Sequence, residues 1–345
     1  MSSTSGWLRR LVVAGLLGLA VAAPAAPTSY ADEDKPHSVF TIDSGDITES
    51  SSLVVSTAHP GLVYTTNDSG DGAIVYVLDA GNGDVVGRTA LSGVDAVDIE
   101  ALAGGSDGSL VVADIGDNQS ERDTVSIYRI QQPTRGEREV EAHEVKLIYR
   151  DGPRDAESVL YDAESGRILV IDKRFEGAQV YQTAPDAFER STAHLRPVAE
   201  APPLATDAAF LRDGDFAVIR NYFSAAVYTY PKWEKVASVE LPAQDQGESV
   251  AVPLEGDSIW IGSEGESSQV LEVTLPPLTP EETADPASPP TPTPSSEVTD
   301  PATPETTSAA DPELESLARI VLLASIGALL LVAAVAVFSR RRPSA

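Results

Sequence analysis

Between residues 38 and 275 the chain consists of short apolar, β-branched runs separated by turns rich in Gly, Asp and Asn, with almost no helical periodicity. This pattern predicts β-strands. The runs form a recurring unit. A polar or acidic pair spaced i and i+2 opens a first strand, a second strand ends in polar residues, a third carries Val/Ile-Tyr, and a fourth varies. One position of this unit recurs at spacings of 49, 57, 50 and 41 residues, at Ser51, Glu100, Glu157, Asp207 and Glu248.

A four-stranded unit that repeats every 40–50 residues or so is typical of a β-propeller blade. Five units are visible, and six is the alternative count. The fifth unit has only three clear strands, and residues 37–42 would supply the fourth and close the ring. We therefore expect an all-β propeller over residues 32–275. A solenoid or a β-sandwich is the alternative, and the repeated acidic openings argue against the sandwich.

The N-terminal residues 1–31 have the pattern of an export signal. Arg9 and Arg10 precede a short apolar run, and Ser29-Tyr30-Ala31 offers a small-x-small cleavage site. An uncleaved anchor is the alternative. Either form predicts that the propeller lies outside the cytoplasm.

The C-terminal part divides into three segments. Residues 276–316 are rich in Pro, Thr and Ser, a composition that predicts a disordered stalk. Residues 317–339 are apolar enough for one transmembrane helix, and residues 340–345 begin with three arginines. By the positive-inside rule, we expect a single-pass protein of the cell membrane with a cytoplasmic C-terminus and an extracytoplasmic head.

The composition excludes several classes of function. The formal net charge of −29 disfavours binding to nucleic acid because phosphates would be repelled. The chain has no cysteine, which excludes thiol catalysis, disulfides and Cys-ligated metals. Nothing in the pattern predicts an oligomer, so we expect a monomer.

In a propeller the first strand of each unit begins at one mouth of the central channel, so the acidic openings should gather there. Clustered carboxylates repel one another unless a cation intervenes, and calcium accepts six to eight oxygen ligands. We therefore predict a calcium site among the opening carboxylates: Glu49, Asp98, Glu100, Asp155, Glu157, Asp207 and Glu248. The alternative is that these carboxylates bind backbone N–H groups of the next unit and only hold the ring together.

Four residues at the ends of second strands are candidates for binding an anionic ligand such as a phosphate or a carboxylate: Lys173, Arg174, Arg220 and Asn221. The alternative is that the cations among them pair with the acidic mouth.

Several motifs resemble a family of secreted bacterial β-propeller proteins with no settled activity. The motifs follow the whole repeat region in order: Glu49-x-Ser51-x-Leu53, Asn67-Asp68-Ser69-Gly70-Asp71, Asp98-x-Glu100, Asp114-Ile115-Gly116-Asp117-Asn118, Arg154-Asp155-Ala156-Glu157 and Gln246-Gly247-Glu248. More distantly, the acidic openings are similar to those of esterase-like and phytase-like propellers and of calcium-activated nucleotidases. That similarity implies a calcium-stabilised ring and does not transfer an activity.

Two functions of different classes follow. The first is a membrane-tethered module that binds or scaffolds an envelope protein or an anionic small molecule. The second is a calcium-dependent hydrolase of a phosphoester, lactone or glycoside, with Glu100, Glu157 or Glu248 as general base. A further reading is a structural envelope protein whose ring needs calcium only to fold.

Overall fold

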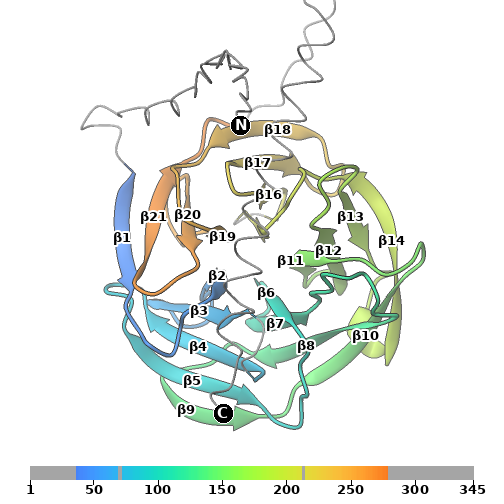
Figure 1. The fold of residues 1–345 in the computed structure, drawn as a ribbon, viewed down its shortest axis with the longest axis horizontal. Coiled ribbons are helices and arrows are strands. Elements are labelled where there is room, and N and C mark those ends of the chain that lie inside the picture. The colour runs from blue at the N-terminus through green and yellow to red at the C-terminus, as the bar shows by residue number, and fades with distance from the viewer. Residues whose placement is uncertain (1–35, 69–71, 212–213, 279–345) are drawn as a thin grey trace, which may run out of the picture. The chain divides into compact units, whose positions relative to one another are not determined.

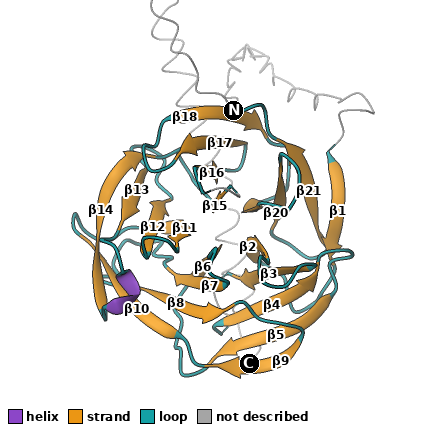
Figure 2. Cartoon of the chain, turned by 180° about the vertical axis from the view of Figure 1, so that it is seen from behind, coloured by secondary structure: helices purple, strands orange, loops and turns teal. Residues whose placement is uncertain are grey.

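The computed structural model describes residues 36–68, 72–211 and 214–278. These residues form a ring of antiparallel, four-stranded units around a central axis, which is the arrangement of a β-propeller (Figures 1 and 2). The all-β prediction is confirmed for this part of the chain. A single turn of 3-10 helix, η1 (Ala187–Glu189), interrupts the strands.

The first two units follow one another along the chain. The first contains β2 (Ser50–Val55), β3 (Leu62–Asn67), β4 (Ile74–Asp79) and β5 (Val85–Leu91). The second contains β6 (Ile99–Gly104), β7 (Ser109–Asp114), β8 (Val125–Gln131) and β10 (His143–Tyr149), and the intervening β9 (Gly136–Val140) joins the first unit.

The next two units have the same order. The third contains β11 (Ala156–Asp162), β12 (Arg167–Asp172), β13 (Gln179–Gln182) and β14 (Thr192–Glu200). The fourth contains β15 (Asp207–Phe210), β16 (Phe216–Arg220), β17 (Ser224–Thr229) and β18 (Lys235–Glu240).

The last unit is completed from the other end of the described chain. It contains β19 (Gly247–Ala251), β20 (Ser258–Ser263) and β21 (Ser268–Thr274), and its outermost strand is β1 (His37–Ile42). Strands β1 and β21 pair antiparallel, with Phe40 opposite Val270. This confirms the prediction that residues 37–42 supply the missing strand, so the ring is closed by hydrogen bonds between distant parts of the sequence.

Parallel strand pairs join the outer edges of the first three units. Strand β9 pairs parallel with β5, so the connection after β8 runs out to the first unit before returning. Strand β10 pairs parallel with β14 and merges the second and third units into one eight-stranded sheet. The longer repeat of the second unit, 57 residues, accommodates this excursion.

The hydrophobic core lies between neighbouring units. Alternate residues of a strand face opposite sides of its sheet, so each unit contributes to two clusters. In β16, Val218 packs toward the fifth unit and Ile219 toward the third. Buried clusters of this kind also lie between the first and second units, the second and third, and the fifth and first. The ring is thus stabilised by apolar contacts at every junction between its units.

The remaining expectations concern other parts of the chain. The predicted signal at 1–31, nearly all of the predicted stalk, the predicted membrane helix at 317–339 and the tail at 340–345 lie outside the described residues. Within the described ranges, the structure contains no helix that is long and apolar enough to cross a bilayer.

Candidate functional site

Each innermost strand begins at the same mouth of the central channel, and in four of the five strands a bulge follows at once. The strand register shifts at residue 51 in β2, 100 in β6, 157 in β11 and 248 in β19. A bulged residue has no partner opposite it in the ladder, and bulges re-aim side chains beside functional sites. The four bulged residues are Ser51, Glu100, Glu157 and Glu248. These are the second members of the acidic openings, so the bulges break the regular alternation that their spacing predicted.

Strand β15 has no such shift, and its acidic residue behaves differently. Asp207 is fully buried and accepts hydrogen bonds from the hydroxyl of Ser52 at 3.2 Å and from the backbone N–H groups of Val250 at 2.8 Å and Ala208 at 2.9 Å. The Ser52 hydroxyl in turn accepts a hydrogen bond from the N–H of Leu102 at 3.1 Å. Asp207 therefore connects strands from four units, directly or through Ser52. We call this hydrogen-bonded group of Ser52, Asp207 and Val250 the central lock. This contact is the structural role considered as the alternative to metal binding.

Three carboxylates converge at the acidic mouth. Oxygen atoms of Asp68, Asp98 and Glu100 all lie within 4.8 Å of one another. Two oxygens bound to one calcium ion are at most about 5.2 Å apart, because Ca–O distances are 2.3–2.6 Å. A single cation could therefore contact all three residues. The Oδ1 atom of Asp98 is buried without a hydrogen-bond partner among the described residues, which leaves it available as a ligand.

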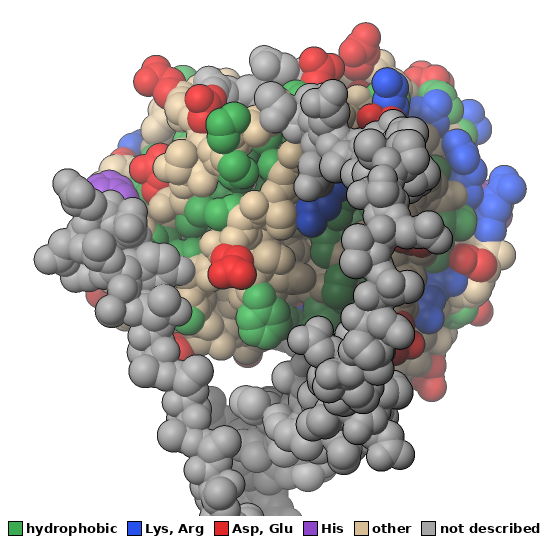
Figure 3. All heavy atoms as spheres, turned by 90° about the horizontal axis from the view of Figure 1, so that it is seen from above, with side chains coloured by type: hydrophobic (Ala, Val, Ile, Leu, Met, Phe, Trp, Pro, Cys, Tyr) green, Lys and Arg blue, Asp and Glu red, His purple; other side chains and the backbone are tan. Residues whose placement is uncertain are grey.

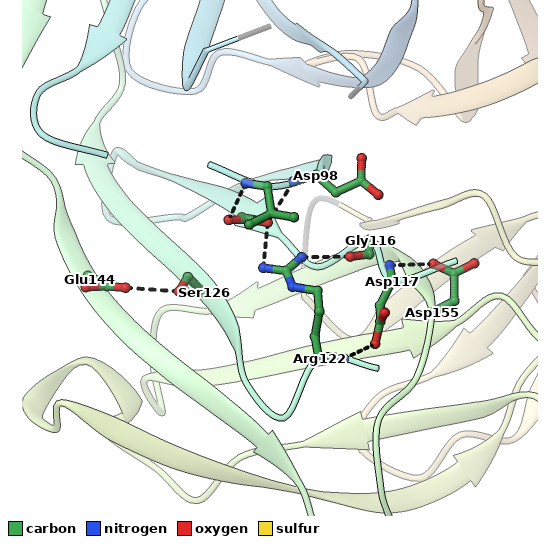
Figure 4. Close-up of polar contacts among 9 residues, drawn as sticks. Asp98, Gly116, Asp117, Arg122, Ser126, Glu144 and Asp155 are labelled. Atoms are coloured by element: carbon green, nitrogen blue, oxygen red, sulfur yellow. Dashed lines mark hydrogen bonds and ion pairs between the residues drawn. The ribbon is translucent and has the colours of Figure 1, made fainter. Parts of the chain in front are cut away.

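The loop after β7 holds Asp98 in place (Figure 4). The carboxylate of Asp114 accepts the backbone N–H groups of Val97 and Asp98, and Arg122 forms an ion pair with Asp114 at 2.8 Å. Arg122 also donates to the carbonyl of Gly116 at 2.7 Å. Asp114 and Arg122 thus hold the backbone of Asp98 in position.

Gly116 leaves room for the carboxylates. A Cβ atom at this position would lie 2.4 Å from Oδ2 of Asp98 and 2.7 Å from Oε1 of Glu100. Any larger residue would therefore push both carboxyl groups out of the cluster. The glycine of the DIGDN motif is a requirement of the site and not only of the turn.

On the opposite side of the mouth a lysine lies between two buried glutamates. Lys173 forms an ion pair with Glu157, and its ammonium lies 5.3 Å from the centre of the Tyr222 ring. The side chains of Gln246 and Tyr222 act on Glu248 and lower its pKa. The Oε2 atom of Glu157 and Oε1 of Glu248 are buried and lack partners in the described part of the chain. This half of the mouth combines fixed positive charge with two free acceptor oxygens.

Burial and mutual repulsion raise the pKa values of the mouth carboxylates. Desolvation, followed by the charges of Asp68 and Asp155, raises the pKa of Asp98 to about 7. Desolvation and then the charge of Glu248 raise the pKa of Glu264 to about 8. For Glu100, desolvation and the charge of Glu157 raise the pKa well above its usual range. Several of these groups therefore hold protons near neutral pH unless a cation is bound.

Burial also raises the pKa values of Glu157 and Glu248, but the positive charge of Lys173 opposes it. Desolvation raises the pKa of each, and the ammonium of Lys173 is the largest effect that lowers it. Desolvation in turn lowers the pKa of Lys173, but the attraction of Glu157 and Glu248 outweighs it and raises that pKa overall. Lys173 therefore stays protonated and compensates part of the negative charge of the mouth.

Arg220 lies behind the mouth and has no access to solvent. Its guanidinium donates hydrogen bonds to the carbonyls of Ser249 at 2.9 Å, Gly262 at 3.2 Å and Asn221 at 3.2 Å. These bonds tie the fourth unit to the fifth. The structure therefore places Arg220 as an internal crosslink, and a ligand at the mouth does not reach it directly.

The other predicted site residues lie around the cluster. Asp155 accepts the backbone N–H of Asp117 at 2.9 Å and so joins the second and third units. Glu49 and Arg174 are exposed at the rim. The side-chain oxygen of Asn221 accepts the N–H groups of Phe223 and Ser224, which shapes the turn that presents Tyr222. Tyr222 was not predicted as a site residue, and its only signal in the sequence is its place between Asn221 and an exposed Phe223.

Charge is unevenly distributed on the outer surface. Acidic side chains are scattered, whereas Lys and Arg side chains gather on one side of the ring in the view of Figure 3. Exposed basic residues lie along the joined β10 and β14 strands and next to η1: Lys146, Arg150, Arg190 and Arg196. The acidic mouth is therefore separate from the basic part of the surface.

Comparison with known proteins adds a distant likeness to solved structures. No family model matches the sequence, and no curated protein matches it. Among solved structures, the chain is similar to a chain in the crystal structure of the nidogen/laminin complex. The identity is 12%, the TM-score is 0.40, and the match covers 62% of this chain and 72% of that chain. The propeller assignment consequently depends on the strand pairing described above.

Proposed function

We propose that the protein is a membrane-tethered, extracytoplasmic binding or scaffold module, built as a five-bladed propeller whose acidic mouth holds a divalent cation. The proposed cation is supported by the convergence of Asp68, Asp98 and Glu100, whose oxygen atoms are close enough together to contact one ion. Hard oxygen donors of irregular arrangement favour calcium over smaller divalent ions.

The two halves of the mouth have different parts in this proposal. Asp98 and Glu100, with Asp68, hold the cation. Lys173 lies across the mouth and, with the bound cation, provides positive charge for an anionic group of a ligand. An anionic small molecule or an acidic loop of an envelope protein fits this arrangement, since the rim around it is polar.

Calcium binding is tested directly by equilibrium dialysis of the full chain followed by metal analysis. We expect close to one tightly bound calcium per chain. Asp98→Asn and Glu100→Gln should each weaken binding at least tenfold, because each removes a charged ligand. Glu137→Gln is the matched control, since Glu137 is exposed on β9 and far in sequence from the cluster. Wild-type stoichiometry near zero, or equal loss in the control, would refute the cation site.

Binding of a partner is tested by pull-down from cell envelopes with the full chain, with calcium or with EDTA. The proposal expects a saturable partner that is retained with calcium and lost with Lys173→Met. If nothing saturable is retained while a substrate is turned over, the binding role is wrong. Membrane tethering is tested separately by fractionation of the full chain and of a chain ending at residue 316, which should be released.

A hydrolase is the second candidate, favoured by the oxygens of Glu157 and Glu248 that lack partners among the described residues at the mouth of the proposed cation. The cation would polarise the substrate, and Glu157 or Glu248 would act as base on water. A panel of phosphoesters, lactones and glycosides with and without EDTA tests this role. Any detected rate that survives Glu157→Gln unchanged excludes Glu157 from it.

A further inference from the structure

The far mouth of the channel contains a pocket of about 450 Å³. Each innermost strand starts at the acidic mouth and ends here, so the pocket is lined by the last residues of β2, β6, β11, β15 and β19. Ligand pockets in proteins commonly have volumes of roughly 300–1,000 Å³. This volume is therefore large enough for a small molecule, and it belongs to neither the cation cluster nor the lysine side of the acidic mouth.

The pocket and the acidic mouth are lined by different residues. The central lock formed by Ser52, Asp207 and Val250 is fully buried, and each of its residues directly precedes a residue that lines the pocket. None of the carboxylates of the acidic cluster lines the far pocket, so a ligand bound there does not contact them. Any binding there is independent of the function proposed above.

Small side chains keep the pocket open. Ala103 and Gly104 end β6, Ala208 and Ala209 belong to β15, and Ala251 ends β19. Larger apolar residues supply the rest of the wall, including Leu53, Leu160 and Phe210. The rings of Phe210 and Tyr230 pack edge to face, with their centroids 4.9 Å apart. The wall therefore offers aliphatic and aromatic contacts to an apolar group.

The charged side chains among the described residues that line the opening are acidic. They are Asp162, Glu164 and Asp215. Burial raises the pKa of Asp162, but hydrogen bonds from Ser165 and Tyr230 outweigh this effect and hold it below the usual value. Asp162 is consequently ionised at neutral pH. An apolar wall below an anionic, partly aromatic rim is complementary to an apolar cation.

We propose that the far mouth binds a small apolar cation, with an alkyl or aryl group in the pocket and an ammonium group at the rim beside Asp162 and Glu164. The apolar wall supplies the affinity. The acidic rim supplies the preference for positive charge, since two carboxylates a few ångströms from an ammonium at a solvated surface favour it about tenfold or more over an anion.

Calorimetric titration of the full chain with 4-phenylbutylammonium tests the proposal, with 4-phenylbutyrate as the anionic probe of matched shape. We expect one saturable site for the cation and binding at least tenfold weaker for the anion. Glu164→Gln should reduce the preference about threefold, because Glu164 is exposed and its charge is partly screened. Glu137→Gln, outside the pocket, should leave it unchanged.

Ala209→Phe in β15 and Ala163→Phe in the turn after β11 should each fill part of the pocket and weaken cation binding at least tenfold. Two variants are used so that a folding defect in one, detected by circular dichroism, leaves the other as the test. Binding of the probe elsewhere on the protein contributes equally to every titration, so it does not affect the comparison between variants. Equal binding of cation and anion, or undiminished binding to a folded variant of either kind, would overturn the proposal.

Discussion

Raising the pH should destabilise the cation-free protein, because the native mouth binds protons that the unfolded chain has already released. Burial moves the pKa of Asp98 from 3.8 to about 7 and that of Glu264 from 4.5 to about 8. A group with a raised native pKa stabilises the native state fully below its unfolded pKa, and this contribution is lost as the pH rises through the native pKa. The expected loss therefore falls between about pH 4 and pH 8.

The magnitude follows from the Asp98 shift alone. At about 1.4 kcal/mol per pKa unit, the rise from 3.8 to about 7 corresponds to roughly 4 kcal/mol. Solvent at the mouth screens part of this interaction, so we expect a fall of about 2–3 kcal/mol in the free energy of unfolding. For a head of this size, the melting temperature should drop by about 5–10 °C between pH 5 and pH 9 in EDTA.

Calcium should reverse this trend, since it binds the deprotonated carboxylates. At a calcium concentration of 100 Kd the native state gains about 2.7 kcal/mol, which offsets the loss at pH 8. At pH 5 Asp98 and Glu264 are almost fully protonated in the native state, so calcium should have little effect. The curves with calcium and with EDTA should therefore diverge as the pH rises.

Urea titrations followed by tryptophan fluorescence at pH 5, 7 and 9 measure this divergence. The double variant Asp98→Asn/Glu264→Gln should flatten the slope in EDTA and abolish the calcium effect, whereas Glu137→Gln should retain both. A stability that rises steadily from pH 5 to pH 9 in EDTA, or a double variant with an unchanged slope, would show that the mouth carboxylates are not the titrating groups.

Two further predictions concern the inside of the ring. Gly247→Ala should lower the free energy of unfolding by about 2–4 kcal/mol, because its Cβ would lie 2.1 Å from Nη2 of the buried Arg220 and displace the guanidinium. Urea unfolding measures the loss. Gly45→Ala is the control and should be neutral, because a Cβ at Gly45 meets open space. Asp207→Ala should cost about 2–4 kcal/mol by leaving the Val250 N–H and the Ser52 hydroxyl without an acceptor. Asp207→Asn should lose less, and equal losses in the two variants would argue against the hydrogen bonds as the cause.

The fold could be predicted from the sequence because the repeat unit is local. Each opening, each second strand and each Val/Ile-Tyr strand lies within one stretch of chain, and the structure has strands at these places, for example β16 and β17. The closing strand β1 was also predictable, since the fifth unit lacks a fourth strand. The crossing of β9 to the first unit was not, because parallel pairing at an outer edge leaves no periodic signal in an exposed segment such as Gly136–Val140.

The site was only partly predictable for a physical reason. The sequence shows which carboxylates reach the channel region, but their roles depend on the register at each strand opening. A shift at Glu100 re-aims that residue at the channel mouth, whereas the regular pairing at Asp207 buries it in the central lock. One residue of register separates a proposed metal ligand from a crosslink, and the spacing of i and i+2 is the same in both cases.

The central lock also decides where chemistry or recognition can take place. Because Ser52, Asp207 and Val250 are fully buried and no carboxylate of the acidic mouth lines the far pocket, the two ends of the axis are separate sites. A hydrolase would have to bind its substrate entirely at the acidic mouth, where the proposed cation, Glu100 and the Lys173–Glu157 pair all lie. Asp207→Ala opens the lock without touching either mouth. If calcium binding and 4-phenylbutylammonium binding stay independent in this variant, the central lock is not what separates the two sites. If one ligand then competes with the other, the central lock separates them.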